Sequence, residues 1–354
     1  MSKIRILIVD DSVIARRFLD KALSVDPALE VVGAVSNGRL ALKKIQLDNN
    51  INLVTLDQEM PEMNGLETLI EIRKTHPRLP VIMVSQYTLR GAAVTLDALF
   101  QGANDYMTKP SAENKELALQ QIRKELIPKI KALCSQQSVA ALDMAPSSLA
   151  KAQPPVQVRQ KVDIVAIGVS TGGPKALATL VPELPRFFSV PIVIVQHMPP
   201  LFTQRLAKSL AAQSAIKVSE AVPGDRLEAG HALVAPGGYH LVLERAATHV
   251  KAQTHQGPEE NSCRPSVDVL FRSVAEIYGA GALAVVLTGM GQDGLKGCEA
   301  IKAAGGQVLV QDKESSVIWS MPGFVAQAGL ADKILPLNQL ATEIIRRIKA
   351  TPKN

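Results

Sequence analysis

Ser170 is a candidate nucleophile because of the segment in which it lies. Residues 164–174 read IVAIGVSTGGP, an apolar run followed by a Ser-Thr-Gly-Gly turn, a proline and a helical pattern. A turn from a strand into a helix exposes its hydroxyl beside backbone N–H groups, and the positive end of the helix dipole stabilises negative charge there. Whether Ser170 acts as a nucleophile therefore depends on a base close to it.

His197 and Asp293 are the candidate base and its carboxylate partner. His197 follows the apolar run 191–196, and Asp293 lies in the turn TGMGQDG after the run 283–287. Taken alone, each residue could be purely structural, with His197 a hydrogen-bonded histidine and Asp293 an aspartate of a turn. Three such residues at carboxyl ends of strands in one sheet favour a triad, in which His197 deprotonates Ser170 and Asp293 orients the imidazole.

Two other classes of site share short patterns with this segment. Residues 168–172 match GxSxG, the nucleophile elbow of α/β-hydrolases, but the chain order here is Ser, His, acid, and no HGGG-type segment is present. A phosphate-binding P-loop needs Gly-Lys-Ser/Thr after its glycines, whereas residues 173–175 read Gly-Pro-Lys. The sequence therefore disfavours an ordinary α/β-hydrolase and a nucleotide site.

A second group of polar residues ends the apolar runs in the first third of the chain. It comprises Asp10, Asp11, Asp57, Ser85 and Lys109. Carboxylate oxygens are ligands for Mg²⁺, and an ammonium and a hydroxyl group bind the oxygens of a phosphoryl group. Each residue alone reads as an ordinary polar strand end. Five of them at matching strand ends predict a site that holds phosphate on an aspartate.

The elements that position these residues are two sets of strands that alternate with helices. Strands are predicted in the first set at 4–10, 30–35, 51–57, 81–85 and 103–109. This alternation predicts a flavodoxin-like, doubly wound parallel sheet of five strands. Strands are predicted in the second set at 163–169, 191–197, 232–235, 283–288 and 307–311, before a last helix at 337–350. The second set predicts another α/β domain with a mainly parallel sheet.

The length of 354 residues suits two domains rather than one. We place the first domain at residues 3–128 and the second at 161–350. The segment between them, 129–160, is interpreted as an interdomain linker. A helical pattern ends near residue 134, and residues 136–160 after it are rich in Gln, Ser, Ala and Pro and lack a sustained apolar period.

Composition and charge argue against several classes of protein. The net charge of +6 is spread along the chain without a dense basic run, which disfavours nucleic-acid binding. Three cysteines without CxxC spacing suggest neither a disulfide framework nor a zinc site. No apolar run reaches the length of a membrane span and no leader pattern is present, so we expect a cytoplasmic protein without membrane insertion.

The first domain resembles a two-component receiver domain. The matching segments are IVDDS at 8–12, TLDQEMPEMNGLE at 55–67, VSQ at 84–86 and YMTKP at 106–110. The resemblance implies a histidine kinase as phosphodonor. It also implies roles for individual residues: Asp57 as phosphoacceptor, Asp10, Asp11, Asp57 and the backbone of Glu59 as Mg²⁺ ligands, Ser85 and Lys109 as sensors of the phosphoryl group, and Tyr106 as the aromatic switch.

The second domain resembles the catalytic domain of the chemotaxis protein-glutamate methylesterases, the CheB family. The matching segments are IGVSTGGP, VIVQHMPPLFTQRLA, PSVDVLFRSVA and LTGMGQDG. The resemblance implies that Ser170, His197 and Asp293 are the triad, with Thr171 and Met290 beside it and backbone N–H groups as the oxyanion site. No cofactor is implied for the esterase chemistry.

The same resemblance implies a substrate and a switch. The substrates would be glutamate methyl esters and glutamines of methyl-accepting chemotaxis receptors, with methanol or ammonia released. The unphosphorylated receiver would block the active site until Asp57 is phosphorylated. Two other outputs are weighed: a second domain that only binds a partner, which the intact triad disfavours, and a DNA-binding module, which the strand-rich pattern disfavours.

Overall fold

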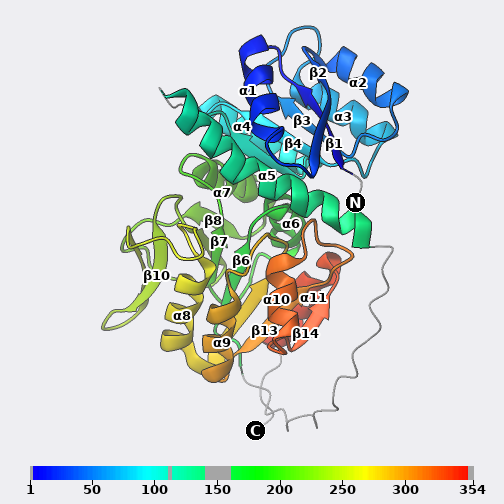
Figure 1. Ribbon diagram of the computed structural model, residues 1–354. Coiled ribbons are helices and arrows are strands. Elements are labelled where there is room, and N and C mark those ends of the chain that lie inside the picture. The colour runs from blue at the N-terminus through cyan, green and yellow to red at the C-terminus, as the bar shows by residue number, and fades with distance from the viewer. Residues whose placement is uncertain (1–2, 111–113, 140–160, 350–354) are drawn as a thin grey trace. The chain divides into compact units, whose positions relative to one another are not determined.

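The computed structural model describes residues 3–110, 114–139 and 161–349 of the chain. Contacts between residues divide the chain into two compact units, Met1–Leu142 and Asp143–Asn354. Each unit is built on its own parallel sheet, so each is described by itself (Figure 1). Among the described residues, no helix is both long and apolar enough to cross a membrane.

The first unit is a five-stranded parallel sheet in the order β2-β1-β3-β4-β5. The strands confirm the five predicted ones and are β1 (Ile4–Val9), β2 (Leu29–Val35), β3 (Leu53–Asp57), β4 (Val81–Ser85) and β5 (Asp105–Thr108). The helices are α1 (Val13–Leu23), α2 (Gly38–Leu47), α3 (Gly65–Thr75), α4 (Leu89–Phe100) and α5 (Lys115–Val139). Helices α1 and α5 pack together, and α2, α3 and α4 form the other layer.

This strand order places the topological switch point, where the order of strand addition reverses, between β1 and β3. In open α/β sheets the ligand site lies at the carboxyl ends of the strands at that point. Both strands are mainly apolar and largely buried, and their acidic residues stand at the carboxyl ends. Asp10 and Asp57 therefore meet at one edge of the sheet.

Helix α5 is longer than the sequence analysis predicts. It continues to Val139, so residues 129–139 of the expected linker are helical. The physical reason is that Ile130, Leu133 and Cys134 are buried and extend the apolar face of the helix beyond Pro128. The rest of the expected linker, 140–160, and residue 350 of the last predicted helix lie outside the described residues.

The second unit is a seven-stranded parallel sheet in the order β14-β13-β12-β6-β7-β9-β8, with a separate antiparallel hairpin, β10-β11. Five strands correspond to predicted ones: β6 (Ile164–Val169), β7 (Ile192–Gln196), β9 (His231–Val234), β12 (Ala282–Val286) and β13 (Gln307–Gln311). Four were not predicted: β8 (Lys217–Glu220), β10 (His240–Arg245), β11 (Val250–His255) and β14 (Lys333–Leu335).

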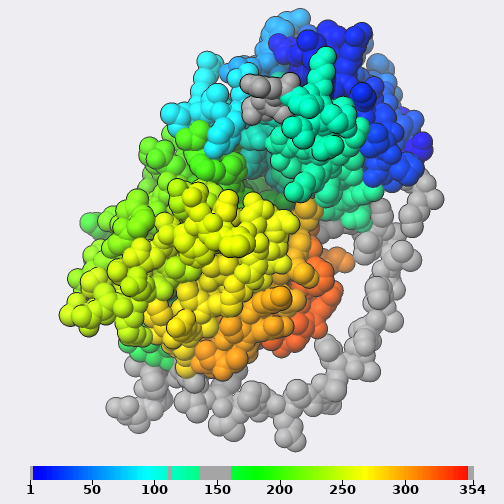
Figure 2. Space-filling view, turned by 60° about the vertical axis from the view of Figure 1, so that its left-hand side comes forward, coloured from blue at the N-terminus to red at the C-terminus, as the bar shows by residue number. Residues whose placement is uncertain are grey.

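Two layers of helices cover this sheet. Helices α8 (Val267–Tyr278), α9 (Leu295–Ala303) and α10 (Ser320–Gln327) contact one another, as do α6 (Gly173–Leu180), α7 (Phe202–Gln213) and α11 (Leu337–Lys349). Short 3₁₀ turns follow α6 at Val181–Glu183 and α8 at Gly279–Gly281. In Figure 2 the surfaces of α8 (yellow) and α9 (orange) lie next to each other. Their packed apolar sides hold both helix starts against the ends of β6 and β12.

Candidate functional site

Ser170 and His197 directly follow two paired strands of the second unit. In the register of β6 and β7, Val169 is opposite Gln196, so the next residues on each strand are the serine and the histidine. The backbone N–H of His197 donates to the carbonyl of Val169 at 3.2 Å. Both residues therefore lie at the carboxyl edge of the sheet, as predicted.

The turn at Ser170 depends on two glycines. Gly172 has φ of +78°, which a side chain would strain, and it precedes helix α6. A Cβ atom on Gly289, after β12, would lie 2.9 Å from Cβ of Ser170. These glycines allow the serine turn to pack closely against the loop after β12, where the Ser170 N–H donates to the Thr288 carbonyl at 3.0 Å.

His197 is bonded to Asp293 through one ring nitrogen. Nε2 of His197 lies 2.8 Å from Oδ2 of Asp293, and the two side chains are 11% and 2% exposed. The other nitrogen, Nδ1, lies 3.6 Å from Sγ of Cys263. Burial alone lowers the pKa of His197, but the bonds to Asp293 and Cys263 outweigh it and raise this pKa above its usual value.

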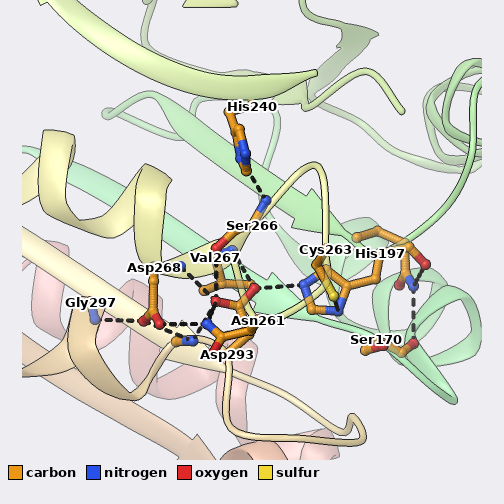
Figure 3. A network of polar contacts seen from close by, with 12 residues as sticks. Ser170, His197, His240, Asn261, Cys263, Ser266, Val267, Asp268, Asp293 and Gly297 are labelled. Carbon is orange, nitrogen blue, oxygen red and sulfur yellow. Dashed lines mark hydrogen bonds and ion pairs between the residues drawn. The ribbon is translucent and has the colours of Figure 1, made fainter. Parts of the chain in front are cut away.

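The Asp293 carboxylate is held at the start of helix α8 (Figure 3). Its oxygens accept hydrogen bonds from the Ser266 hydroxyl at 2.8 Å, the Val267 N–H at 2.7 Å, the Asp268 N–H at 3.0 Å and the Asn261 amide at 2.9 Å. Burial favours the neutral acid, but His197 and these backbone donors lower the pKa of Asp293 to about 2. Asp293 is thus a fixed anion that orients the imidazole.

A second buried aspartate fixes the turn that carries Asp293. Oδ1 of Asp268 accepts from the N–H groups of Gly294 at 2.9 Å and Gly297 at 2.7 Å, at the start of α9. Asn261 donates to both aspartates, at 2.9 Å to each. Burial raises the pKa of Asp268 above its usual value, and the neighbouring Asp293 adds to the rise. Asp268, on α8, therefore caps α9, while Asp293, next to α9, caps α8.

The three predicted triad residues lie at the same sheet edge, but they are not all linked by hydrogen bonds. Within the described residues, no hydrogen bond joins the Ser170 hydroxyl to His197. The side chain of Gln196 instead connects their backbones, since Nε2 donates to the Ser170 carbonyl at 3.0 Å and to the His197 carbonyl at 3.3 Å. In ligand-free enzymes the bond between nucleophile and base is often formed only with substrate.

Thr171 and Met290 occupy the two loops that meet at Ser170. Thr171 is buried, and its carbonyl accepts from the Thr288 hydroxyl at 2.9 Å. Met290 is partly exposed and follows Gly289, which is packed against Ser170. Both residues thus lie on the loops around Ser170, and a role at the site stays a prediction for each.

Four of the residues predicted to form a phosphorylation site in the first unit, Asp10, Asp11, Asp57 and Lys109, lie close together. Nζ of Lys109 lies 3.0 Å from Oδ2 of Asp10 and 2.9 Å from Oδ1 of Asp57. Oxygens of Asp10, Asp11 and Asp57 all lie within 4.8 Å of one another. A polar cavity of about 140 Å³ adjoins them, and its lining includes Asp11, Asp57, Glu59 and Lys109.

The donor set suits Mg²⁺. Oδ2 of Asp10 is buried and accepts no hydrogen bond from the described residues, although the Lys109 ammonium is near it. A hard cation, which prefers oxygen ligands, would be coordinated by this oxygen atom. Burial, together with the negative charge of Asp10, outweighs the lowering effect of Lys109 and raises the pKa of Asp57 to about 6. The charge of Lys109 thus does not fully offset the negative charge of the carboxylates, and a divalent cation would offset the remainder.

Ser85 ends the strand next to that of Asp57, and Tyr106 lies on the strand after it. The buried Ser85 hydroxyl donates to Oε1 of Gln58 at 3.0 Å. Tyr106 is buried, and burial raises its pKa well above the usual value. The Lys129 ammonium lies 5.2 Å from the centre of its ring and donates to the Tyr106 carbonyl at 2.6 Å.

Several residues of the catalytic network were missed from sequence. Asp268 and Ser266 belong to the motif PSVDVLF, but no role was assigned to either, and Asn261 and Gln196 were not singled out. Ser266 stands directly before an apolar helical period, which is a signal for the N-cap of a helix. This signal could have located the start of α8, where backbone N–H groups bind a carboxylate.

Two family models match the chain. The model described as "CheB methylesterase" covers residues 165–344, and the one described as "Response regulator receiver domain" covers residues 6–121. A solved structure, the CheB methylesterase catalytic domain of Thermotoga maritima, is 42% identical with a TM-score of 0.52, over 53% of this chain and 99% of that one.

Full-length relatives match across both units. A protein of Trichodesmium erythraeum is 57% identical over 98% of this chain and 100% of its own length. A protein of Nocardioides sp. is 47% identical over 98% of this chain and 96% of its own. Both bear the name protein-glutamate methylesterase/protein-glutamine glutaminase.

Proposed function

The chain belongs to the CheB methylesterase family and carries a receiver domain, and from this membership we propose that it is a phosphorylation-activated hydrolase of receptor glutamate methyl esters and glutamines. The observation that supports this most is the position of His197, bonded to Asp293 and placed next to Ser170 at the strand ends. A hydroxyl, an imidazole and a carboxylate in this arrangement perform acyl transfer.

Acylation begins at the Ser170 hydroxyl. Because Nε2 of His197 is bonded to Asp293, Nδ1 is the ring nitrogen that takes the Ser170 proton as Oγ attacks the ester carbonyl. The Asp293 carboxylate, with its pKa of about 2, stays ionised and stabilises the imidazolium. Backbone N–H groups at the start of α6 are the proposed donors to the oxyanion.

The leaving group departs with the proton held by His197. Methanol leaves from an ester, or ammonia from a glutamine, and an acyl-serine remains. Water, deprotonated by His197, then attacks the acyl group, so the products are a glutamate carboxylate and free Ser170. Ammonia is the poorer leaving group, so the general-acid role of His197 matters more for deamidation.

The proposed substrates are methyl-accepting chemotaxis receptors, with the reaction in the cytoplasm. Thr171 and Met290 border the nucleophile and are proposed to contact the receptor segment. The catalytic domain is proposed to span residues 161–350 and the receiver residues 3–128, joined by the segment 129–160.

The proposed switch is phosphorylation of Asp57 by a chemotaxis histidine kinase. Asp10, Asp11, Asp57 and the backbone of Glu59 would hold Mg²⁺, which when bound offsets the negative charge of the incoming phosphoryl group. Lys109 and Ser85 are proposed to bind the phosphoryl oxygens, and Tyr106 to change position in response. Phosphorylation would release a receiver that otherwise blocks the receptor site.

The test is methanol release from receptor membranes that carry radiolabelled methyl esters. The full chain should release methanol, a small-molecule phosphodonor should increase the rate, and Ser170→Ala should reduce the rate by several orders of magnitude. Ser209→Ala, on helix α7, is the matched control and should retain the rate. A folded chain that takes phosphate on Asp57 but releases no methanol in either state would instead support a second domain that only binds a partner.

A further inference from the structure

Cys263 lies in the active site but has no part in the proposed reaction. Its Sγ lies 3.6 Å from Nδ1 of His197, which is the ring nitrogen that is not bonded to Asp293. Figure 3 shows the sulfur next to the imidazole. One ligand atom each of His197, Cys263 and Asp293 lies within 4.8 Å of the others. Thiolate, imidazole and carboxylate are the groups that bind Zn²⁺.

The separation of the two atoms is that of two ligands of one ion. With Zn–N near 2.0–2.1 Å and Zn–S near 2.3 Å, a tetrahedral angle puts nitrogen and sulfur about 3.6 Å apart. We propose that His197 Nδ1 and Cys263 Sγ form an inhibitory binding site for a thiophilic divalent cation of the Zn²⁺ type. The sequence gives no such signal, because the two residues lie 66 positions apart.

The surroundings of His197 already have the form found around zinc ligands. A metal-bound imidazole usually donates its other ring N–H to a carboxylate, which fixes the ring and increases its basicity. Here Nε2 is bonded to Asp293, which five further donors hold in place. The His197 side chain is 11% exposed and Cys263 is partly exposed, so an ion can reach both from solvent.

Binding the ion uses the lone pair that catalysis requires. The Cys263 thiol loses its proton to solvent, the thiolate and Nδ1 each donate a pair to the ion, and water fills the remaining positions. Nδ1 can then no longer accept the Ser170 proton. This inhibition rests on the proposed function, whereas binding of the ion does not. With two protein ligands, the site is weaker than a structural zinc site with four.

The experiment titrates the full chain with Zn²⁺ and, separately, with Co²⁺. Methanol release is measured at each Zn²⁺ concentration and compared with the rate of the same variant in chelator. We expect saturable inhibition that the chelator reverses. In Cys263→Ala and the more conservative Cys263→Ser, the half-inhibiting Zn²⁺ concentration should rise at least tenfold. Cys134→Ala, in the other unit, is the matched control and should behave as the unchanged chain.

The absorption spectrum of the Co²⁺ complex measures metal binding independently of enzyme activity. A thiolate-to-cobalt charge-transfer band should appear in the unchanged chain and in Cys134→Ala and be absent from both Cys263 variants. The oxygen ligands around Asp57 give no such band. A band with no methanol release from any sample supports the metal site and counts against the proposed function. An active chain without the band, or with equal Zn²⁺ inhibition in the Cys263 variants, overturns the inference.

Discussion

Asp57 and Asp293 are both buried carboxylates, yet their pKa values move in opposite directions. Asp293 accepts hydrogen bonds from one side-chain amide, one hydroxyl, the imidazole and backbone N–H groups, and its pKa is lowered to about 2. Asp57 has Lys109 and the Gln58 N–H, while Asp10 adds negative charge, and its pKa is raised to about 6. The number of donors decides the sign, since burial alone raises both.

The raised pKa of Asp57 predicts that Asp57→Asn stabilises the first unit at neutral pH. The pKa of Asp57 is above its ordinary value of 3.8 in the folded state. The protonated carboxyl therefore stabilises the fold fully below pH 3.8, and this stabilisation is lost as the pH rises through about 6. Two pKa units correspond to about 3 kcal/mol. This figure already includes the ion pair with Lys109 and is an upper bound, which the poorer fit of an amide reduces, so we expect a net gain of about 1–2 kcal/mol.

Urea unfolding in chelator, at pH 7.5 and at pH 5, checks this prediction. The gain of Asp57→Asn over the unchanged chain should be largest at pH 7.5 and shrink as pH falls through about 6, because the unchanged carboxyl then takes up its proton. Asp11→Asn, at an exposed neighbour, should give a small change at both pH values. An equal gain at pH 7.5 and pH 5 would contradict the raised pKa.

At the scale of elements, helices α8 and α9 stabilise each other through their starts. Asp293 accepts from the first N–H groups of α8, and Asp268 of α8 accepts from N–H groups at the start of α9. A negative charge at a helix start is favourable because of the helix dipole and the unpaired N–H groups there. The orientation of His197 thus depends on the packing of two helices.

Asp268→Asn should therefore lower both stability and kcat. The new amide would face the Asn261 amide that donates to Asp268, and a flipped Asn261 would turn its oxygen toward Asp293. Either arrangement leaves a buried group unpaired, which costs about 1–3 kcal/mol. We expect a kcat roughly tenfold lower with little change in KM, since Asp268 is buried and acts through the position of Asp293.

Kinetics of methanol release and urea unfolding of the full chain measure these two effects. Asp163→Asn is a suitable control in the same unit, because its side chain is 46% exposed and pairs with Lys161. It should leave kcat unchanged. A normal kcat in Asp268→Asn, or a loss confined to KM, would show that the α8 and α9 starts do not position the imidazole.

How much of this could be predicted from sequence differs between elements. Buried strands such as β3 and β12 are mainly apolar runs, and the polar residue at each end marks the sheet edge, so the strand ends that carry the predicted site residues were located from sequence. Strands β8, β10 and β11 are partly exposed, with polar residues that blur the apolar pattern. They were missed for that reason.

The side chains that contact Asp293 and His197 could not be predicted in this way. Asn261, Ser266 and Asp268 reach Asp293 from 25 to 32 positions away, and Cys263 reaches His197 from 66. Spacing along the chain cannot give such distances, because they depend on how α8 packs against the sheet. Residues at the strand ends were therefore predictable, whereas those that orient them were not.

At the scale of the whole molecule, the proposed switch requires the receiver to oppose catalysis until it is phosphorylated. A shortened chain that begins at Lys161 should then be faster than the full chain, because nothing competes with the receptor for Ser170. A difference of about 1.4 kcal/mol between blocked and open arrangements gives a tenfold change in rate. We expect the shortened chain to release methanol at least tenfold faster than the unphosphorylated full chain.

The phosphodonor separates this explanation from a simple change in the catalytic domain. The donor should bring the full chain toward the rate of the shortened chain, leave the shortened chain unchanged, and have no effect on Asp57→Asn, whose basal rate should persist. Initial rates of methanol release for the three proteins, with and without donor, measure all of these effects. Equal rates for the shortened and unphosphorylated chains would mean that phosphorylation adds an interaction with the receptor instead of removing a block.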